Sequence, residues 1–150
     1  MTPAVRAAER AGIEFRLHEY SQAEYGESDY AVAVARELGV DPARVFKTLV
    51  ASVSGDLHVF VVPSERQLDL RAVGKRAEMA DRAKVERVTG YAAGGISPLG
   101  QRRLLPTTVD ESALAFDTIL VSAGRRGLQM ELDPRDLVRL TRADTRGVAH

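Results

Sequence analysis

The sequence predicts a single α+β domain built on a largely antiparallel or mixed sheet, and three observations lead to this fold class. Its 150 residues are the length of one ordinary domain and suffice to bury a core. Apolar residues make up 45% and charged residues 28%, which is the balance of a globular protein. Helical signals fall between hairpin signals without strict strand–helix alternation, which favours α+β. We find no repeat and no linker, so we expect one domain over residues 1–150.

Capping residues and apolar periodicity place the individual elements. Thr2-Pro3 is typical of a helix start, and Gly12 ends that helix. Ser28 and Gly39 bound a second helix in the same way. Two β-branched runs around Ser54-Gly55-Asp56 predict a hairpin. In chain order we expect a helix at 3–11, a strand at 13–20, a loop at 21–27, a helix at 29–38, a turn at 41–42, strands at 45–53 and 57–62, helices at 70–76 and 82–88, a glycine-rich loop at 91–100, strands at 104–109, 118–122 and 127–132, a short helix from 134, an edge strand at 141–145 and a frayed tail after 146.

The composition argues against several kinds of chemistry. The chain has no cysteine, which rules out disulfides, thiolate metal sites and a cysteine nucleophile. Its three histidines, His18, His58 and His150, are scattered, so we expect no metal and no cofactor. Apolar stretches stay far short of the roughly 18 residues that a membrane span needs. Because the N-terminus also lacks a secretory h-region, we expect a cytoplasmic protein that does not enter a membrane.

Charge is unevenly distributed along a chain whose net charge is zero. Residues 66–103 carry nine Lys and Arg against four Asp and Glu, a local excess of five positive charges. Such a stretch suits a partner with an anionic feature that is gripped locally. It equally suits a solvated helix face rich in Arg and Lys, and the sequence alone leaves both interpretations open.

Lys47 is the first candidate functional residue. It lies between Phe46 and Thr48, at the start of a predicted strand whose neighbours are apolar. A lysine there either extends its ammonium to solvent or points it into a pocket that holds an anionic or electron-rich group. The solvent-directed arrangement is the commoner one for a lysine, so this position needs support from elsewhere in the chain.

Two glycine-containing segments could bring the backbone close to a ligand. Gly94-Gly95-Ile96-Ser97-Pro98 could form an anion-binding turn, with a hydroxyl from Ser97 and a stiff end at Pro98. Gly124-Arg125-Arg126-Gly127 predicts a hairpin whose glycines lie against a ligand and whose arginines lie near phosphates. The alternative interpretations are a plain turn and a hairpin with exposed arginines, and for each segment taken alone the alternative is the commoner one.

No familiar catalytic motif accompanies these segments. We find no Ser-His-Asp order, P-loop, paired carboxylates or metal-ligand spacing. An enzyme without an evident acid, base or metal must work by positioning and by stabilising an oxyanion. That requirement suits a reactive substrate such as an aminoacyl ester.

In combination, these segments resemble the YbaK/EbsC family of Cys-tRNA(Pro) deacylases, which are relatives of the editing domain inserted in bacterial prolyl-tRNA synthetases. The resemblance extends over nearly the whole chain. Its most specific blocks are 94–101, which reads Gly-Gly-Ile-Ser-Pro-Leu-Gly-Gln, and 119–128, which reads Ile-Leu-Val-Ser-Ala-Gly-Arg-Arg-Gly-Leu. Shorter matching blocks lie at 1–5, 45–49, 67–70, 78–81 and 89–91.

The resemblance implies a YbaK-like α+β fold, with a mixed, barrel-like sheet flanked by helices. It also implies that Lys47 is the functional lysine, held near the 3′-terminal adenosine and the ester. The predicted substrate pocket consists of Tyr20, Thr48, Gly94, Gly95, Ile96, Ser97, Pro98, Ser122, Gly124 and Gly127. The predicted tRNA contacts are Arg102, Arg103, Arg125 and Arg126.

The implied activity is trans-editing, in which cysteine is removed from mischarged Cys-tRNA(Pro). The cysteinyl thiol would attack its own ester carbonyl, which makes sense of a pocket without a catalytic cysteine. The implied partners are tRNA(Pro) and prolyl-tRNA synthetase. Two alternatives stay open: a deacylase for another amino acid, such as Ala-tRNA(Pro), and a non-catalytic module that binds tRNA ends or nucleotides. Gln129 departs from the family pattern, because some relatives carry an acid there, and this leaves amino-acid preference open.

Overall fold

The computed structural model describes residues 1–20 and 30–150, so the predicted loop at 21–27 and the Ser28 cap lie outside the described residues. No helix in these two ranges is long and apolar enough to cross a bilayer. The elements are α1 (Pro3–Ala11), β1 (Phe15–Glu19), α2 (Tyr30–Leu38), the 3₁₀ helix η2 (Pro42–Arg44), β2 (Phe46–Val53), β3 (Asp56–Pro63), α3 (Leu70–Val73), β4 (Ala77–Met79), α4 (Arg82–Thr89), β5 (Thr107–Asp110), the 3₁₀ helix η3 (Glu111–Ala115), β6 (Ile119–Arg125), β7 (Leu128–Leu132), α5 (Pro134–Thr141) and β8 (Asp144–Arg146).

The strands form two open sheets. The first has the order β1-β7-β6 and is antiparallel throughout. The second has the order β4-β2-β3-β5-β8, with antiparallel pairing on the β4 side and parallel pairing of β3 with β5 and of β5 with β8. The α+β class with mixed strand pairing is therefore confirmed, whereas the expected barrel-like sheet is two separate sheets without closure.

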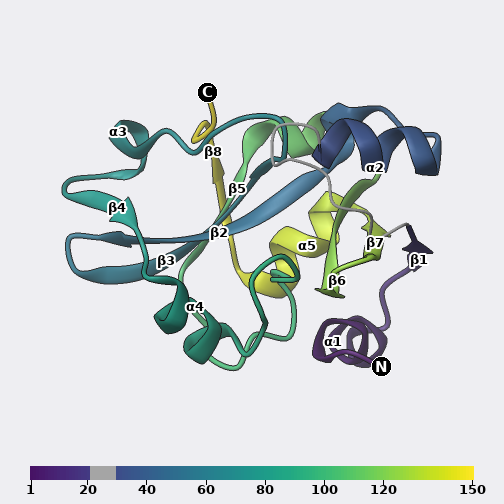
Figure 1. The fold of residues 1–150 in the computed structure, drawn as a ribbon, viewed down its shortest axis with the longest axis horizontal. Helices are drawn as coiled ribbons and strands as arrows, with labels where there is room; N and C mark the ends of the chain where they lie inside the picture. Colours follow the sequence, from purple (N-terminus) through teal and green to yellow (C-terminus); the bar gives the residue numbers. More distant parts are fainter. Residues whose placement is uncertain (21–29) are drawn as a thin grey trace.

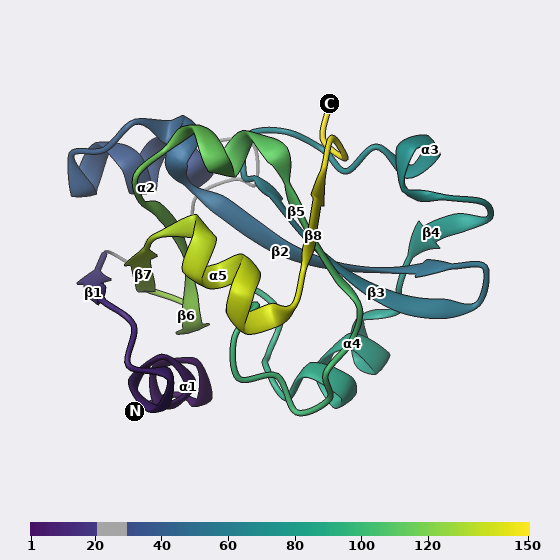
Figure 2. The same ribbon diagram turned by 180° about the vertical axis from the view of Figure 1, so that it is seen from behind.

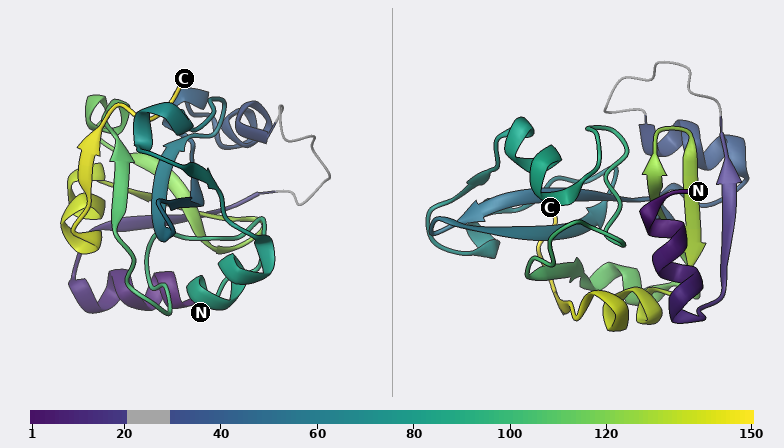
Figure 3. Two further views of the ribbon diagram at one scale, coloured as in Figure 1. Left: turned by 90° about the vertical axis from the view of Figure 1, so that its left-hand side faces the viewer. Right: turned by 90° about the horizontal axis from the view of Figure 1, so that it is seen from below.

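The two sheets meet where β2 begins. An isolated parallel bridge joins Val45 to Leu120, so the start of β2 runs beside β6. From there the β2–β3 hairpin extends along the molecule to β4 and α3 at the opposite end (Figures 1 and 2). The view from below shows the same separation, with α1 beside β6 and β7 (Figure 3).

Helices cover both faces of the three-stranded sheet. Val121 and Ala123 of β6 point toward α1 and share the largest core cluster with Ala4 and Ala8. Leu137 of α5 belongs to the same cluster and is fully buried. A second cluster lies on the other side, where the described α2 residues Ala31, Val34 and Ala35 pack with Tyr20 and Val45. The junction of the sheets is therefore held between two cores.

Several elements differ from the sequence expectation. The 3₁₀ helix η3 was not expected, and the edge strand expected at 141–145 is β8 at 144–146, because Thr141 still belongs to α5. The helix expected at 70–76 ends at Val73, and residues 77–79 form strand β4 against β2. Gly74 ends the helix with a φ of +148°, far from helical values, and it lies so close to β2 that a Cβ there would be 2.8 Å from Cγ1 of Val53. The strand expected at 104–109 begins only at Thr107, because Pro106 has no N–H to donate to a ladder.

The expectation of a frayed tail after residue 146 is wrong. Val148 is completely buried, and Oδ1 of Asp110 accepts hydrogen bonds from the backbone N–H groups of Val148 (2.9 Å) and Ala149 (3.1 Å). Gln67 and His150 exchange backbone hydrogen bonds of 3.1 and 2.9 Å. A buried carboxylate therefore anchors a segment whose own sequence carries no strong structural signal.

The pKa of Asp110 reflects this role. Burial acts to raise the pKa, but hydrogen bonds from Ser112, Val148 and Ala149 outweigh it and hold the pKa below its ordinary value. Because the folded-state pKa is depressed, the stabilisation is present above the unfolded-state pKa and is lost as pH falls through the folded-state pKa.

We predict that Asp110→Ala lowers the free energy of unfolding at pH 7 by about 3 kcal/mol, because the buried N–H groups of the tail lose their acceptor. The measurement is urea unfolding of the wild type and the variant at pH 7 and under acidic conditions. The difference between them should shrink as pH falls. Asp117→Ala, at an exposed position, is the control and should be nearly neutral. A variant as stable as the wild type at pH 7 would contradict the anchoring role.

Candidate functional site

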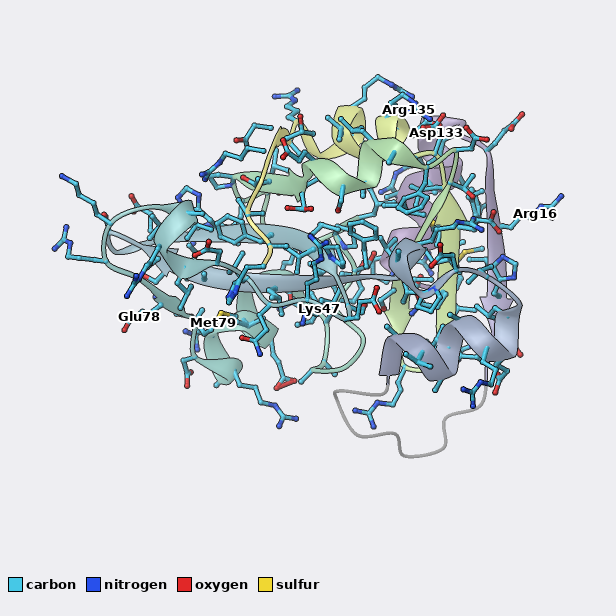
Figure 4. All side chains as sticks on the ribbon, turned by 90° about the horizontal axis from the view of Figure 1, so that it is seen from above. Arg16, Lys47, Glu78, Met79, Asp133 and Arg135 are labelled. Atoms are coloured by element: carbon cyan, nitrogen blue, oxygen red, sulfur yellow. The ribbon has the colours of Figure 1, made fainter. Side chains whose placement is uncertain are left out.

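Lys47 lies at the junction of the two sheets. Side chains alternate along β2, so Phe46 and Thr48 point to one side and Lys47 to the other. On that other side, Val45 packs against Tyr20 and the described residues of α2. Lys47 is half-buried, and the stick view places it near the middle of the molecule, away from both ends (Figure 4).

The strand registers bring Tyr20 and Ser122 toward the same place. Counting two residues on from the Val45–Leu120 bridge reaches Lys47 on β2 and Ser122 on β6. Tyr20 follows β1 directly, and its N–H donates to the carbonyl of Gly127 at 3.0 Å. Tyr20, just after β1, therefore packs with Val45 at the start of β2, and Lys47 and Ser122 each lie two residues beyond the bridged pair.

The Gly94-Gly95 turn packs directly on the tip of the β6–β7 hairpin. A Cβ at Gly95 would lie 2.8 Å from the Cα of Arg125, and a Cβ at Gly94 would lie 2.8 Å from Nη2 of Arg126. Gly94 also has a φ of +87°, a conformation that other residues rarely adopt. The two glycine-containing segments that the sequence singled out are thus one structural unit, and the glycines allow the two backbones to touch.

Gly124 has a packing role of its own. Its φ is +108°, and a Cβ there would lie 2.9 Å from the Tyr91 ring. The β6–β7 ladder shifts register between Ser122 and Arg125, and the N–H of Gly124 donates to Oγ of Ser122 at 3.2 Å. Such a bulge redirects side chains next to it. Ser122 therefore lies at a point where the strand departs from regular pairing.

The side chains of 96–98 hold the loop in place. Ser97 is completely buried, and its Oγ accepts from the N–H of Leu99 at 3.2 Å. The Tyr91 hydroxyl donates to the carbonyl of Leu99 at 2.6 Å, and burial raises the pKa of Tyr91 to about 12. Ile96 packs against two core clusters, and Pro98 is buried. The Ser97 hydroxyl is directed into the loop interior, so contact with an aminoacyl group stays a prediction for this residue.

Thr48 is nearly buried on the face of β2 opposite Lys47. Its Oγ1 has no hydrogen-bond partner among the described residues. A buried hydroxyl without a partner is uncommon in folded proteins. The side chains of Thr48 and Lys47 therefore point to opposite faces of β2, and the place of Thr48 in the substrate pocket stays a prediction.

The four arginines predicted to contact tRNA are all exposed. Arg125 forms an ion pair with Glu19 at 3.5 Å, whereas the guanidinium of Arg126 lies over Gly94. Arg102 lies over Gly90, and the backbone N–H groups of Arg102 and Arg103 donate to the last turn of α4. The arginines thus flank the glycine-rich loop on both sides. Within the described ranges, no group of His, Cys, Asp or Glu could hold a metal ion.

Sequence reasoning missed a polar cluster around Glu131. Its Oε2 accepts from Oγ1 of Thr118 at 2.6 Å and from Nη2 of Arg44 at 3.1 Å, and its Oε1 lies 2.8 Å from Nε2 of His18. The Thr118 hydrogen bond, together with the His18 hydrogen bond and the positive charge of Arg44, outweighs burial and holds the pKa of Glu131 below its ordinary value. No local pattern could reveal this cluster, because its members come from four separate segments.

A cleft of about 660 Å³ opens beside this cluster. Its walls include Arg16 from β1, Asp133 from the start of α5 and Glu131 itself. Arg16, Asp133 and Arg135 lie at the end of the molecule that holds the three-stranded sheet, whereas Glu78 and Met79 lie at the far end (Figure 4). None of Tyr20, Lys47 and Ser122 lines this cleft.

The chain is similar to proteins of tRNA editing. The family profile of the aminoacyl-tRNA editing domain matches residues 27–140, which include every predicted site residue except Tyr20. The chain is 37% identical over 147 residues to "Putative Cys-tRNA(Pro)/Cys-tRNA(Cys) deacylase EbsC" of Enterococcus faecalis, covering 93% of this chain and 88% of that one. It is 27% identical over 108 residues to "Uncharacterized protein YwhH" of Bacillus subtilis, covering 69% of each.

A solved structure shares the whole fold. A protein described as "a putative trans-editing enzyme for prolyl tRNA synthetase" superposes with a TM-score of 0.84 at 25% identity. The match covers 100% of this chain and 99% of that chain. The two-sheet arrangement described above is thus the arrangement of a known editing fold.

Proposed function

The chain belongs to the aminoacyl-tRNA editing domain family, and from this premise we propose that it is a trans-editing deacylase that removes cysteine from mischarged Cys-tRNA(Pro). The proposal is supported by the packing of Tyr20 with Val45, two residues before Lys47, and by the bridge from Val45 to Leu120, two residues before Ser122. The relative named as a Cys-tRNA(Pro)/Cys-tRNA(Cys) deacylase supports the choice of amino acid. The enzyme would act in the cytoplasm on tRNA(Pro), with or without docking on prolyl-tRNA synthetase.

The nucleophile in this proposal is the thiol of the substrate. The chain has no cysteine to supply one. The cysteinyl sulfur, once deprotonated, attacks its own ester carbonyl, and a C–S bond forms to give a cyclic thiolactone. The bond between the carbonyl carbon and the ribose oxygen breaks, and that oxygen takes up a proton. The protein has only to hold the ester in a near-attack geometry and to stabilise the negative charge on the carbonyl oxygen.

We assign to Lys47 the role of stabilising the negative charge that develops on the carbonyl oxygen. It projects from a strand, which gives it a better-defined position than a loop would. The N–H of Gly95 is already bonded to the carbonyl of Ala92 at 3.0 Å, so it is not available as an oxyanion donor in this arrangement. The Gly94-Gly95 turn instead contributes its shape and the neighbouring guanidinium of Arg126.

The test of the function is a deacylation panel with Cys-, Ser-, Ala- and Pro-tRNA(Pro), run as single turnovers at saturation. We expect Cys-tRNA(Pro) to react fastest, because a few per cent of a thiol with a pKa of about 8.5 is ionised at neutral pH, whereas a hydroxyl offers almost no anion. Mass analysis should detect the thiolactone. Equal rates for Cys and Ser, or cysteine formed directly with solvent oxygen, would point to water activated by the protein. If Ala-tRNA(Pro) reacts fastest, the protein is a deacylase of another specificity. If it binds tRNA without turnover, it is a non-catalytic module.

We predict that Lys47→Met, which keeps the length of the side chain and removes its charge, lowers kcat/KM by roughly 100-fold. The fold should persist, which circular dichroism and urea unfolding will show. Arg10→Met, an exposed cation on α1, serves as the control and should keep wild-type turnover. Wild-type turnover by a well-folded Lys47→Met protein would remove Lys47 from the mechanism.

We also predict that the exposed arginines beside the glycine-rich loop grip tRNA through phosphates. The logarithm of the affinity for uncharged tRNA(Pro) should then fall with the logarithm of salt concentration, with a slope of roughly −0.7 for each single-strand phosphate contact. Replacing Arg102 and Arg103 together by Ala should make the slope shallower. Arg139→Ala is the control, since Arg139 is paired with Asp136 on α5. If the affinity does not depend on salt, the basic stretch is a solvated surface and does not contact the tRNA phosphates.

A further inference from the structure

One carboxylate joins the segments that lead into the proposed site. Glu131 on β7 contacts His18 on β1, Arg44 on η2 and Thr118 before β6. Nε of Arg44 also donates to the backbone carbonyl of Thr118 at 2.9 Å, and its Nη2 donates to the Thr118 hydroxyl. Three of these four segments are far apart in the sequence, so the cluster holds together parts of the chain that local structure does not join.

Each contact lies a few residues upstream of a site residue. His18 precedes Tyr20 by two positions, Arg44 precedes Lys47 by three, and Thr118 precedes Ser122 by four. In extended chain these separations correspond to roughly 7–13 Å. The contacts of Glu131 therefore fix the chain only two to four residues before Tyr20, Lys47 and Ser122, which is close enough to influence how each of these residues is placed.

The cluster also lies beside the junction of the two sheets. Arg44 immediately precedes Val45, and Thr118 lies two residues before Leu120, so the side-chain contacts reinforce the Val45–Leu120 backbone bridge. The side chains of Glu131, Arg44 and His18 are only 21%, 22% and 27% exposed. Partly sheltered, hydrogen-bonded charge pairs of this kind are stronger and better defined than those on an open surface.

Neighbouring carboxylates in the same cleft do not have this arrangement. Asp133 pairs with Arg135, and Asp136 pairs with Arg139, so each ion pair stays within the first turns of α5. Each of these ion pairs joins residues only two or three positions apart in the sequence. They provide matched controls for Glu131, with the same charge and the same cleft.

We propose that Glu131 is a positioning residue for the deacylase site, because it holds the sheet junction so that Lys47 and Ser122 keep their places relative to the ester. The inference rests on the proposed function and deepens it. A near-attack geometry is sensitive to displacements of about 1 Å, which can lower a rate by roughly 100-fold. A positioning residue should therefore affect kcat more than KM, since the tRNA is gripped elsewhere.

The experiment compares Glu131→Ala, Glu131→Gln and Asp133→Asn with the wild type on Cys-tRNA(Pro). We expect Glu131→Ala to lower kcat by roughly 10- to 100-fold with little change in KM or in affinity for uncharged tRNA(Pro). Glu131→Gln should recover much of the rate, because its amide oxygen can still accept from Thr118 and Arg44. Asp133→Asn should behave as the wild type. Mass-detected hydrogen exchange of residues 44–48 and 118–122 reports on the junction without turnover, and Glu131→Ala should accelerate it.

The outcomes separate this inference from the function. A wild type that deacylates none of the substrates overturns the proposed function, and the exchange data then still decide whether Glu131 holds the junction. An active wild type with unchanged kcat in Glu131→Ala overturns the positioning role, even if urea unfolding shows lower stability. An equal loss of kcat in Asp133→Asn would also overturn it. If hydrogen exchange at residues 44–48 and 118–122 is unchanged in Glu131→Ala, Glu131 does not hold the sheet junction.

Discussion

The meeting of two open sheets at the start of β2 is the constraint on which the site depends. The Val45–Leu120 bridge joins a three-stranded antiparallel sheet to a five-stranded mixed sheet. Because Lys47 belongs to one sheet and Ser122 to the other, a rotation of the sheets about this point would separate them. Core packing on both sides of the three-stranded sheet opposes that rotation, since a close-packed interior deforms little. The geometry of the site is therefore a property of the junction.

Close contact between backbones is the second requirement. Gly95 lies so near the Cα of Arg125 that a larger residue would force the loop and the hairpin apart. The buried side chains of Tyr91 and Ser97 hold the loop through hydrogen bonds to the backbone of Leu99. These contacts place exposed arginines next to the glycines, and the packing alone accounts for glycine at these positions. Because packing alone requires glycine at these positions, the glycine motif by itself does not show whether the loop also binds a ligand.

The proposed reaction requires few catalytic groups from the protein. In the proposed mechanism the substrate supplies the nucleophile, and the protein contributes positioning and the charge of Lys47. Positioning places a high demand on rigidity, and Lys47 meets it by projecting from a strand. The polar cluster at Glu131 extends the same logic to the segments that enter the site.

The sequence by itself determined the features with local causes: the helix caps, the β2–β3 and β6–β7 hairpins, the α+β class and the family to which the motifs belong. Only the tertiary structure decided that 77–79 pairs with β2, that the C-terminal tail is buried against Asp110, and that two sheets meet without closing. It also decided that the Thr48 and Lys47 side chains point to opposite faces of β2 and that Glu131 contacts His18 and Arg44, which lie far from it in the sequence. Caps and turns are encoded in adjacent residues, whereas the free energy of a buried contact depends on which distant side chains fill the space around it.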